Sequence, residues 1–185
     1  NHLVVIPARA GSTRLPRKPL RLIAGRTLLH RTIAMARAAI SDRDDVALVV
    51  ATDDEDIAAH AREAGCPAVM TDSALATGSG RALAAALSFA EGPRFVVNLQ
   101  GDSPFQPEGA LGAVLAALES GAEVATPVIA LDWESLDALR EHKLLSPFSG
   151  TTCVRAPNGR ALWFSKAILP AIRDEDRLRA TDGLS

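Results

Sequence analysis

The chain has 185 residues, of which 48% are hydrophobic and 23% charged, as expected of a soluble globular protein with a buried core. Lys and Arg number 20 and Asp and Glu number 22, and the net charge of −2 argues against a nucleic-acid partner or a membrane surface. No apolar run approaches the roughly 20 residues of a membrane helix, and residues 1–3 do not open a signal peptide. Cys66 and Cys153 lie far apart, which favours free thiols in a reduced cytoplasm.

Short apolar runs alternate with helical patterns along the first 130 residues. Continuous runs, typical of strands buried on both faces of a sheet, lie at residues 3–6, 46–51, 67–70 and 95–99. A further run at 124–131 predicts another strand.

Four helices are predicted between these strands. The first has an apolar face formed by Leu29, Ile33, Ala36 and Ile40. The second is capped at 52–55, with acidic residues in its first turn, and ends at Gly65. The third is Ala-rich and carries, at helical spacing, Leu83, Leu87 and Ala90. The fourth directs inward Leu111, Val114, Leu115 and Leu118.

This alternation of strands and helices predicts a mostly parallel α/β sheet with right-handed crossovers. The pattern changes after about residue 130, where Asn158-Gly159 separates two strand-like segments at 151–155 and 160–164. Asn-Gly is typical of a hairpin, so we expect an antiparallel element to join the sheet late. No linker divides the chain, which favours a single domain.

Basic residues are concentrated in the loop after the first predicted strand. Residues 9–18 contain four cations, a glycine and two hydroxyls: Arg9, Arg14, Arg17, Lys18, Gly11, Ser12 and Thr13. Ligands of an open parallel sheet bind at the carboxyl ends of its strands, where this loop lies. Because glycine lets N–H groups turn toward an anion and Arg and Lys bind phosphate oxygens, we interpret it as a phosphate-binding loop. The alternative is a solvated basic loop. Neither a P-loop pattern nor a Gly-x-Gly fingerprint is present.

Asp102 follows the strand at 95–99 directly, within Gln100-Gly101-Asp102, and is therefore expected at the same edge of the sheet. A carboxylate beside a polyanion site is favourable when a cation lies between them. Mg²⁺ fits, because it takes one or two carboxylates together with phosphate oxygens and water. The alternative is an Asp that caps a turn before Pro104.

These segments resemble a known family. Ile-Pro-Ala-Arg at 6–9, Ser-Thr-Arg-Leu-Pro at 12–16 and Lys-Pro-Leu at 18–20 are similar to the opening of the 3-deoxy-manno-octulosonate cytidylyltransferase (CMP-Kdo synthetase) family. Later motifs of that family are resembled, in the same order, by 50–53, 77–81, 98–102 and 161–165. The resemblance covers essentially the whole chain.

The resemblance implies a mostly parallel, Rossmann-like nucleotidyltransferase sheet of the glycosyltransferase-A type with a late antiparallel hairpin. It implies one domain over residues 1–185, with a nucleotide-binding core at 1–130 and a sugar-binding and dimerisation part at 131–185. A family C-terminal segment, with a second magnesium carboxylate, is expected beyond Ser185.

The implied reaction joins CTP and an eight-carbon sugar acid, 3-deoxy-manno-octulosonate, to give CMP-Kdo and pyrophosphate for lipopolysaccharide biosynthesis. A cytoplasmic homodimer is expected. The implied catalytic residues are Arg9, Lys18 and Asp102, with Asp102 as the Mg²⁺ ligand. The implied nucleotide-binding residues are Pro7, Ala8, Arg9, Gly11, Ser12, Arg14, Lys18, Thr52, Thr77, Gly78 and Arg81. The sugar acid would contact Gln100 and Lys166.

Some positions depart from the family pattern. The acidic residue that usually precedes Arg81 is Gly80 here, the usual Arg after Phe-Ser is Lys166, and a Lys near the first hairpin strand is replaced by Thr151-Thr152. The alternatives are therefore a related CMP-sugar synthetase of the sialate type and a divergent, non-catalytic nucleotide-binding protein. The histidines lie in no motif and are expected to be surface or packing residues: His2, His30, His60 and His142.

Overall fold

The structure is a computed structural model that describes residues 1–11, 15–107 and 109–181. Its residues group into two compact units, Asn1–Pro127 and Val128–Ser185. Among the described residues, no helix is long and apolar enough to cross a membrane.

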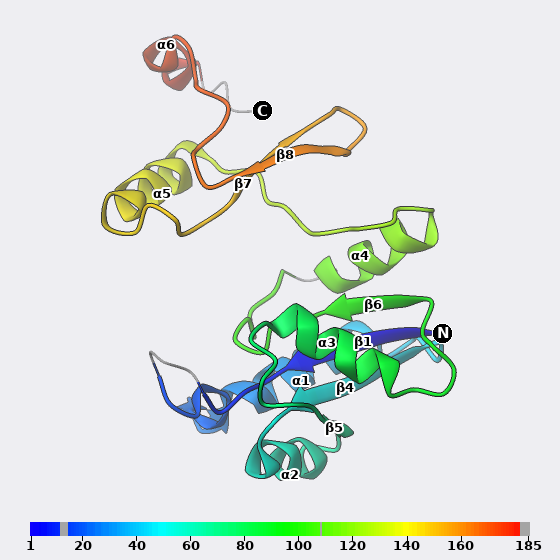
Figure 1. Cartoon of the computed structure of the whole chain (residues 1–185). Helices are drawn as coiled ribbons and strands as arrows, with labels where there is room; N and C mark the ends of the chain where they lie inside the picture. The colour runs from blue at the N-terminus through cyan, green and yellow to red at the C-terminus, as the bar shows by residue number, and fades with distance from the viewer. Residues whose placement is uncertain (12–14, 108, 182–185) are drawn as a thin grey trace. The chain divides into compact units, whose positions relative to one another are not determined.

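The first unit is built on a four-stranded parallel sheet (Figure 1). Its strands are β1 (His2–Pro7), β4 (Val46–Thr52), β5 (Ala68–Met70) and β6 (Phe95–Asn98), in the order β5-β4-β1-β6. The four strands predicted from continuous apolar runs are thus confirmed. β1 lies between β4 and β6, and its apolar residues Leu3 to Ile6 are at most 2% exposed.

Helices cover both faces of this sheet. α1 (Leu28–Ala39), α2 (Glu55–Glu63) and α4 (Ala110–Glu119) pack in one apolar cluster with Val4 and Ile6 of β1. α3 (Gly78–Leu87) packs in a second cluster with Leu3 and Val5, whose side chains point to the opposite face. The result is a three-layer α/β/α arrangement.

Local signals set the ends of these helices. Asp54 caps α2, because its carboxylate accepts the N–H of Ile57 at 2.9 Å, and Gly65 follows the helix with φ 74°. The predicted apolar faces of α1 and α4 are buried, except that Val114 is only partly so. In α3, by contrast, Leu83 and Leu87 are exposed, and small residues such as Ala82 and Ala85 face the sheet.

Short elements that the apolar pattern does not reveal follow the loop after β1. They are the 3-10 turn η1 (Lys18–Leu20) and the small hairpin of β2 (Leu22–Ile23) and β3 (Arg26–Thr27). Pro19 is buried in η1, so this turn anchors the end of the loop.

The second unit contains α5 (Trp133–Leu145), the hairpin of β7 (Thr152–Arg155) and β8 (Ala161–Ser165), and α6 (Glu175–Ala180). Arg140 of α5 and Glu175 of α6 form a bidentate ion pair, with distances of 2.7 and 2.8 Å. This pair joins the two helices within the unit.

Two expectations for this part of the chain were wrong. Residues 124–131 form no strand: Val124 and Ile129 are 86% and 72% exposed, and Pro127 has no N–H to donate to a neighbouring strand. The hairpin exists, but among the described residues β7 and β8 pair only with each other and do not join the parallel sheet.

Candidate functional site

A pocket of about 500 Å³ lies in the first unit at the carboxyl ends of β1 and β6. These strands are neighbours, while the chain leaves β1 on its other side to form β4. The connections therefore diverge at this point, which is where open α/β sheets bind ligands. Nine of the predicted site residues line the pocket: Pro7, Ala8, Arg9, Lys18, Thr77, Gly78, Arg81, Gln100 and Asp102.

Two glycines allow the pocket walls to come together. A Cβ on Gly101 would lie 2.8 Å from the carbonyl oxygen of Pro7, closer than a real side chain comes. A Cβ on Gly78 would lie 3.3 Å from Pro7 and 3.4 Å from Gln100. The end of β1 thus meets the segment after β6 through backbone atoms, and the start of α3 lies against the side chains of Pro7 and Gln100.

Lys18 and Asp102 form the charged centre of the pocket. Lys18 Nζ donates to Asp102 Oδ2 at 2.7 Å, although the two residues are 84 positions apart in sequence. Their side chains are 39% and 50% exposed, so solvent and a ligand can reach both. Asp102 is the only carboxylate lining this pocket in the described part of the chain. The Asp102 carboxylate suits the role of a protein ligand for a magnesium ion whose other ligands are phosphate and water oxygens.

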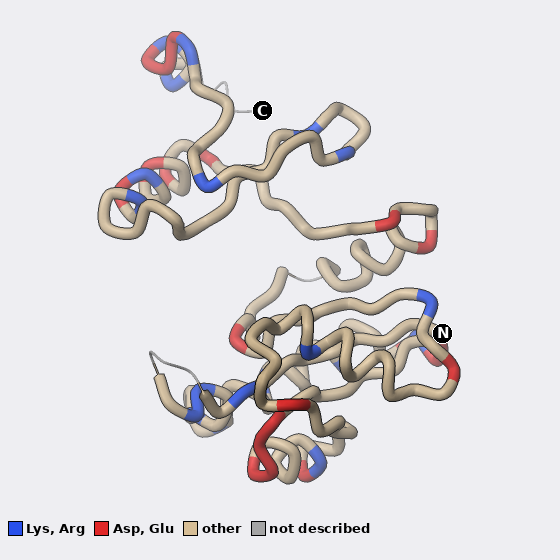
Figure 2. Tube along the Cα trace, in the orientation of Figure 1, with Lys and Arg blue, Asp and Glu red and all other residues tan. Residues whose placement is uncertain are grey.

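Arg9 and Arg17 of the same loop have different partners. Arg9 Nη1 donates to the carbonyl of Ala76 at 3.3 Å, so its guanidinium is held across the pocket. Arg17 pairs with Asp54 at 3.3 Å and with Asp56, at the acidic start of α2 that Figure 2 shows in red. These carboxylates raise the pKa of Arg17, chiefly through the hydrogen bond that Arg17 donates to Asp56. Arg17 therefore anchors the loop and does not line the pocket.

Other predicted nucleotide-binding residues lie elsewhere. Gly11 is exposed and outside the pocket lining. Thr52 is fully buried, and its hydroxyl accepts the N–H of Asp54 at 3.2 Å, so it supports the end of β4. Ser12 and Arg14 lie outside the described residues.

Arg81 is part of the pocket lining but is only 2% exposed. It pairs with Asp53 at 2.9 Å, and it also donates to the Thr71 hydroxyl and, at 3.3 Å, to the Leu75 carbonyl. The sequence alone placed Asp53 in a helix cap, and only the fold brings it to Arg81. The signal available beforehand was a charged residue directly after a buried strand.

The two predicted sugar-binding residues belong to different units. Gln100 Nε2 donates to Asn98 Oδ1 at 3.1 Å, which orients its amide at the pocket wall. Lys166 lies in the second unit, where its Nζ donates to the Thr151 hydroxyl at 2.8 Å. Lys143 holds the backbone there, since its Nζ donates to the carbonyls of Ser149 and Lys166 at 2.6 Å.

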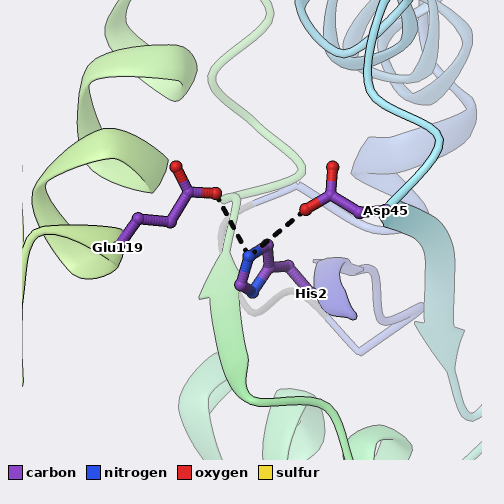
Figure 3. A group of neighbouring side chains, drawn as sticks. All are labelled: His2, Asp45 and Glu119. Carbon is purple, nitrogen blue, oxygen red and sulfur yellow. Dashed lines mark ion pairs between the residues drawn. The ribbon is translucent and has the colours of Figure 1, made fainter.

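A second charged cluster surrounds His2, at the amino end of β1 (Figure 3). His2 Nε2 lies 3.4 Å from Asp45 and 3.2 Å from Glu119, within reach of a shared metal ion. Arg43, however, already pairs with both carboxylates. Its hydrogen bonds lower the pKa of Asp45 to about 2. The cluster is therefore a neutralised ion-pair group that joins α4 to the sheet, as the packing interpretation of the histidines expects.

Comparison with known proteins agrees with this geometry. A family profile described as "Cytidylyltransferase" matches residues 3–182. The 3-deoxy-manno-octulosonate cytidylyltransferase of Maricaulis maris is 42% identical over 176 residues, which cover 94% of this chain and 67% of that protein. That of Anaeromyxobacter dehalogenans (strain 2CP-1) is 40% identical over 167 residues, covering 90% of this chain and 64% of the other.

The chain belongs to the cytidylyltransferase family. It spans about two thirds of the length of these relatives. Its fold is that of a solved CMP:2-keto-3-deoxy-manno-octonic acid synthetase complexed with CTP, with a TM-score of 0.73 over 95% of this chain and 68% of that one, at 24% identity.

Gly80, which departs from the family pattern, lies in the first turn of α3. Gly80 donates its N–H to the Thr77 hydroxyl at 3.0 Å, which caps α3. A Cβ at this position would lie 3.1 Å from the same oxygen, tighter than most contacts. The glycine therefore suits a close turn at the pocket wall.

Proposed function

We propose that the protein joins CTP and 3-deoxy-manno-octulosonate to give CMP-Kdo and pyrophosphate, in the pathway to lipopolysaccharide. The observation that carries this proposal is the pocket in which Arg9, Lys18 and Asp102 meet at the carboxyl ends of β1 and β6. The relatives of the chain are named 3-deoxy-manno-octulosonate cytidylyltransferase, which describes this reaction. Sequence positions 9, 18 and 102 come together there only through the parallel pairing of the two strands.

In the proposed reaction the anomeric hydroxyl of the sugar attacks the α-phosphorus of CTP, and the bond from that phosphorus to the bridging oxygen breaks. Pyrophosphate leaves with that bond's electron pair, and the proton of the hydroxyl passes to solvent. Such a transfer needs alignment and neutralisation of phosphate charge more than covalent help from the protein. Arg9 and Lys18 supply positive charge at the pocket, and the hydrogen bond from Arg9 to Ala76 orients its guanidinium.

The ion pair between Lys18 and Asp102 suits a site that alternates between empty and loaded states. Without ligand, each side chain is the counter-ion of the other. When a triphosphate enters, Lys18 can donate to its oxygens, and the Asp102 carboxylate becomes available to a cation. We propose that Asp102 holds Mg²⁺, which when bound neutralises phosphate oxygens and makes the α-phosphorus more electrophilic.

We also propose a cytoplasmic homodimer. The exposed side chains of Leu162, Trp163 and Phe164 on β8 support dimerisation, because large apolar side chains on both faces of a hairpin favour burial by a partner. Sedimentation of the full-length protein tests this proposal, and a monomer at all concentrations would contradict it.

Pyrophosphate release from CTP by the full-length protein, measured with a panel of sugar acids, tests the proposed reaction. We expect turnover with 3-deoxy-manno-octulosonate and magnesium. Turnover with a sialic acid alone would replace the substrate assignment, and the absence of both turnover and CTP binding would overturn the proposal.

Two variants test the roles within the pocket. Asp102→Asn should lower kcat by roughly 100-fold or more, because the ligand charge for the metal is lost. Lys18→Ala should raise the KM for CTP about tenfold, as expected for a lost charge-assisted hydrogen bond. Arg21→Ala is the matched control for Lys18→Ala, since it removes an exposed positive charge that lies three residues after Lys18 and outside the pocket lining. Wild-type kinetics for Asp102→Asn would contradict the metal assignment.

A further inference from the structure

The ion pair between Arg81 and Asp53 lies at the pocket lining, and no step of the proposed reaction uses it. Arg81 is 2% exposed and Asp53 14% exposed, and their side chains meet at 2.9 Å. Asp53 follows β4 directly, whereas Arg81 lies in the first turn of α3. The pair therefore joins the carboxyl end of β4 to the first turn of α3.

Arg81 also binds two residues of the segment between β5 and α3, which spans residues 71–77. Its Nη1 donates to the hydroxyl of Thr71, which itself donates to the Thr52 carbonyl at 3.0 Å. Its Nη2 donates to the carbonyl of Leu75 at 3.3 Å as well as to Asp53. One guanidinium thus clamps residues 71–75 against the end of β4.

The next residues of this segment form the wall of the nucleotide pocket. Ala76 and Thr77 line the pocket, and the Ala76 carbonyl accepts the hydrogen bond from Arg9. The position of Arg9 therefore depends on the backbone that Arg81 clamps. Asp53 itself is outside the lining, so it acts on a ligand only through Arg81.

A contribution to folding stability does not by itself explain the carboxylate of Asp53. Its Oδ1 atom is buried and has no hydrogen-bond partner among the described residues. An unsatisfied buried oxygen lowers stability, and buried ion pairs contribute little net stability against apolar replacements. Removing the carboxylate would nevertheless leave a buried guanidinium without its counter-ion, which is the more unfavourable state. The arrangement is explained by the need to hold Arg81 in one place.

We propose that Asp53 is a positioning residue for nucleotide binding. Through Arg81 it holds the segment 71–77, and with it Arg9, in the geometry that receives the triphosphate. This inference rests on the proposed use of CTP.

The test compares Asp53→Asn with wild type in the full-length protein, by calorimetric titration with CTP and by pyrophosphate-release kinetics. We expect the Kd and KM for CTP to rise roughly tenfold, with the KM for the sugar acid unchanged. A merely structural role gives a different result, because partial unfolding lowers the active fraction and hence kcat while both KM values stay the same.

Two further variants complete the test. Asp72→Asn is the matched control: it removes a charge from the same segment, but Asp72 contacts the N–H of Ala74 and not Arg81, so CTP affinity should remain that of wild type. Thr71→Val removes a neutral partner of Arg81 and keeps the ion pair, so it should weaken CTP binding less than a folded Asp53→Asn protein does. If Asp53→Asn does not fold, Thr71→Val alone should still show weaker CTP binding than wild type.

The outcomes separate the inference from the proposed function. CTP affinity within about twofold of wild type in folded Asp53→Asn, or in Thr71→Val if Asp53→Asn does not fold, would overturn the inference alone. A fall in kcat with both KM values unchanged would do the same. A wild-type protein that does not bind CTP would overturn the proposed function and the inference with it.

Discussion

Replacing Gly101 by Ala tests whether the close approach of β1 and β6 builds the pocket. The added Cβ would lie 2.8 Å from the Pro7 carbonyl oxygen and 3.4 Å from Ile6 Cγ2. Ordinary contact begins at 3.4 Å, so the two chain segments would have to separate by about 0.6 Å. The Pro7 oxygen is part of the backbone and has no rotamer by which to move away.

This separation acts on both stability and activity. Overpacking of this kind costs about 1–3 kcal/mol of the free energy of unfolding. The Gly101 carbonyl also accepts a hydrogen bond from the buried Thr32 hydroxyl at 3.1 Å, so the backbone cannot shift without straining that contact. Asp102 is the next residue, and a displacement approaching 1 Å at a reacting centre costs roughly 100-fold in rate. We expect kcat/KM to fall by about 10- to 100-fold.

Urea denaturation and pyrophosphate-release kinetics of Gly101→Ala measure the two effects. Gly112→Ala is the control, because Gly112 lies in α4 with no atom near its Cβ position. There the substitution should stabilise the protein by about 0.5–1 kcal/mol through helix propensity and leave activity unchanged. A Gly101→Ala protein with wild-type stability and kinetics would refute the reasoning.

Three other predictions concern residues outside the catalytic set. Arg17→Gly and Arg17→Ala both remove the ion pairs of Arg17. Because Arg17 has φ 53°, only glycine also removes the strain of a left-handed backbone. The Gly variant should therefore be more stable than the Ala variant by roughly 1 kcal/mol in urea denaturation. A hydrogen bond from Arg43 lowers the pKa of Asp45 from 3.8 to about 2. A hydrogen bond from Arg140 lowers the pKa of Glu175 from 4.5 to about 2. The unfolded chain therefore binds these protons more readily, and thermal stability should be full above pH 4.5 and fall as the pH drops toward about 2. Burial raises the pKa of the Cys66 thiol from 9.0 to about 11, so alkylation of native protein at mildly alkaline pH should be about a hundredfold slower than in urea, as read by mass spectrometry.

Each of these predictions has a clear contrary result. Equal stabilities of the two Arg17 variants would show that the left-handed backbone carries no strain. Thermal stability that stays constant from neutral pH to pH 2 would contradict the two carboxylate assignments. Labelling of Cys66 at the same rate in native and unfolded protein would contradict its burial, which leaves it 1% exposed.

Much of the first unit could be predicted from the sequence because its signals are local. A continuous apolar run such as residues 3–6 can be stable only where both faces are covered, and a cap such as Asp54 acts on the N–H groups of its own helix. The same reasoning failed at 124–131, because a strand needs a partner and the pattern does not say whether one is present. It also left α5 unnoticed.

The site divides in the same way. Residue types and order were enough to predict a basic loop after one buried strand and a carboxylate after another, and parallel strands bring such residues to one edge. Tertiary structure alone decided which charges face the pocket: Lys18 meets Asp102, whereas its neighbour Arg17 turns to α2. It also decided that Arg81 is buried against Asp53. The physical reason is that the partner of a charge depends on distances across the fold, which residue types and local spacing do not specify.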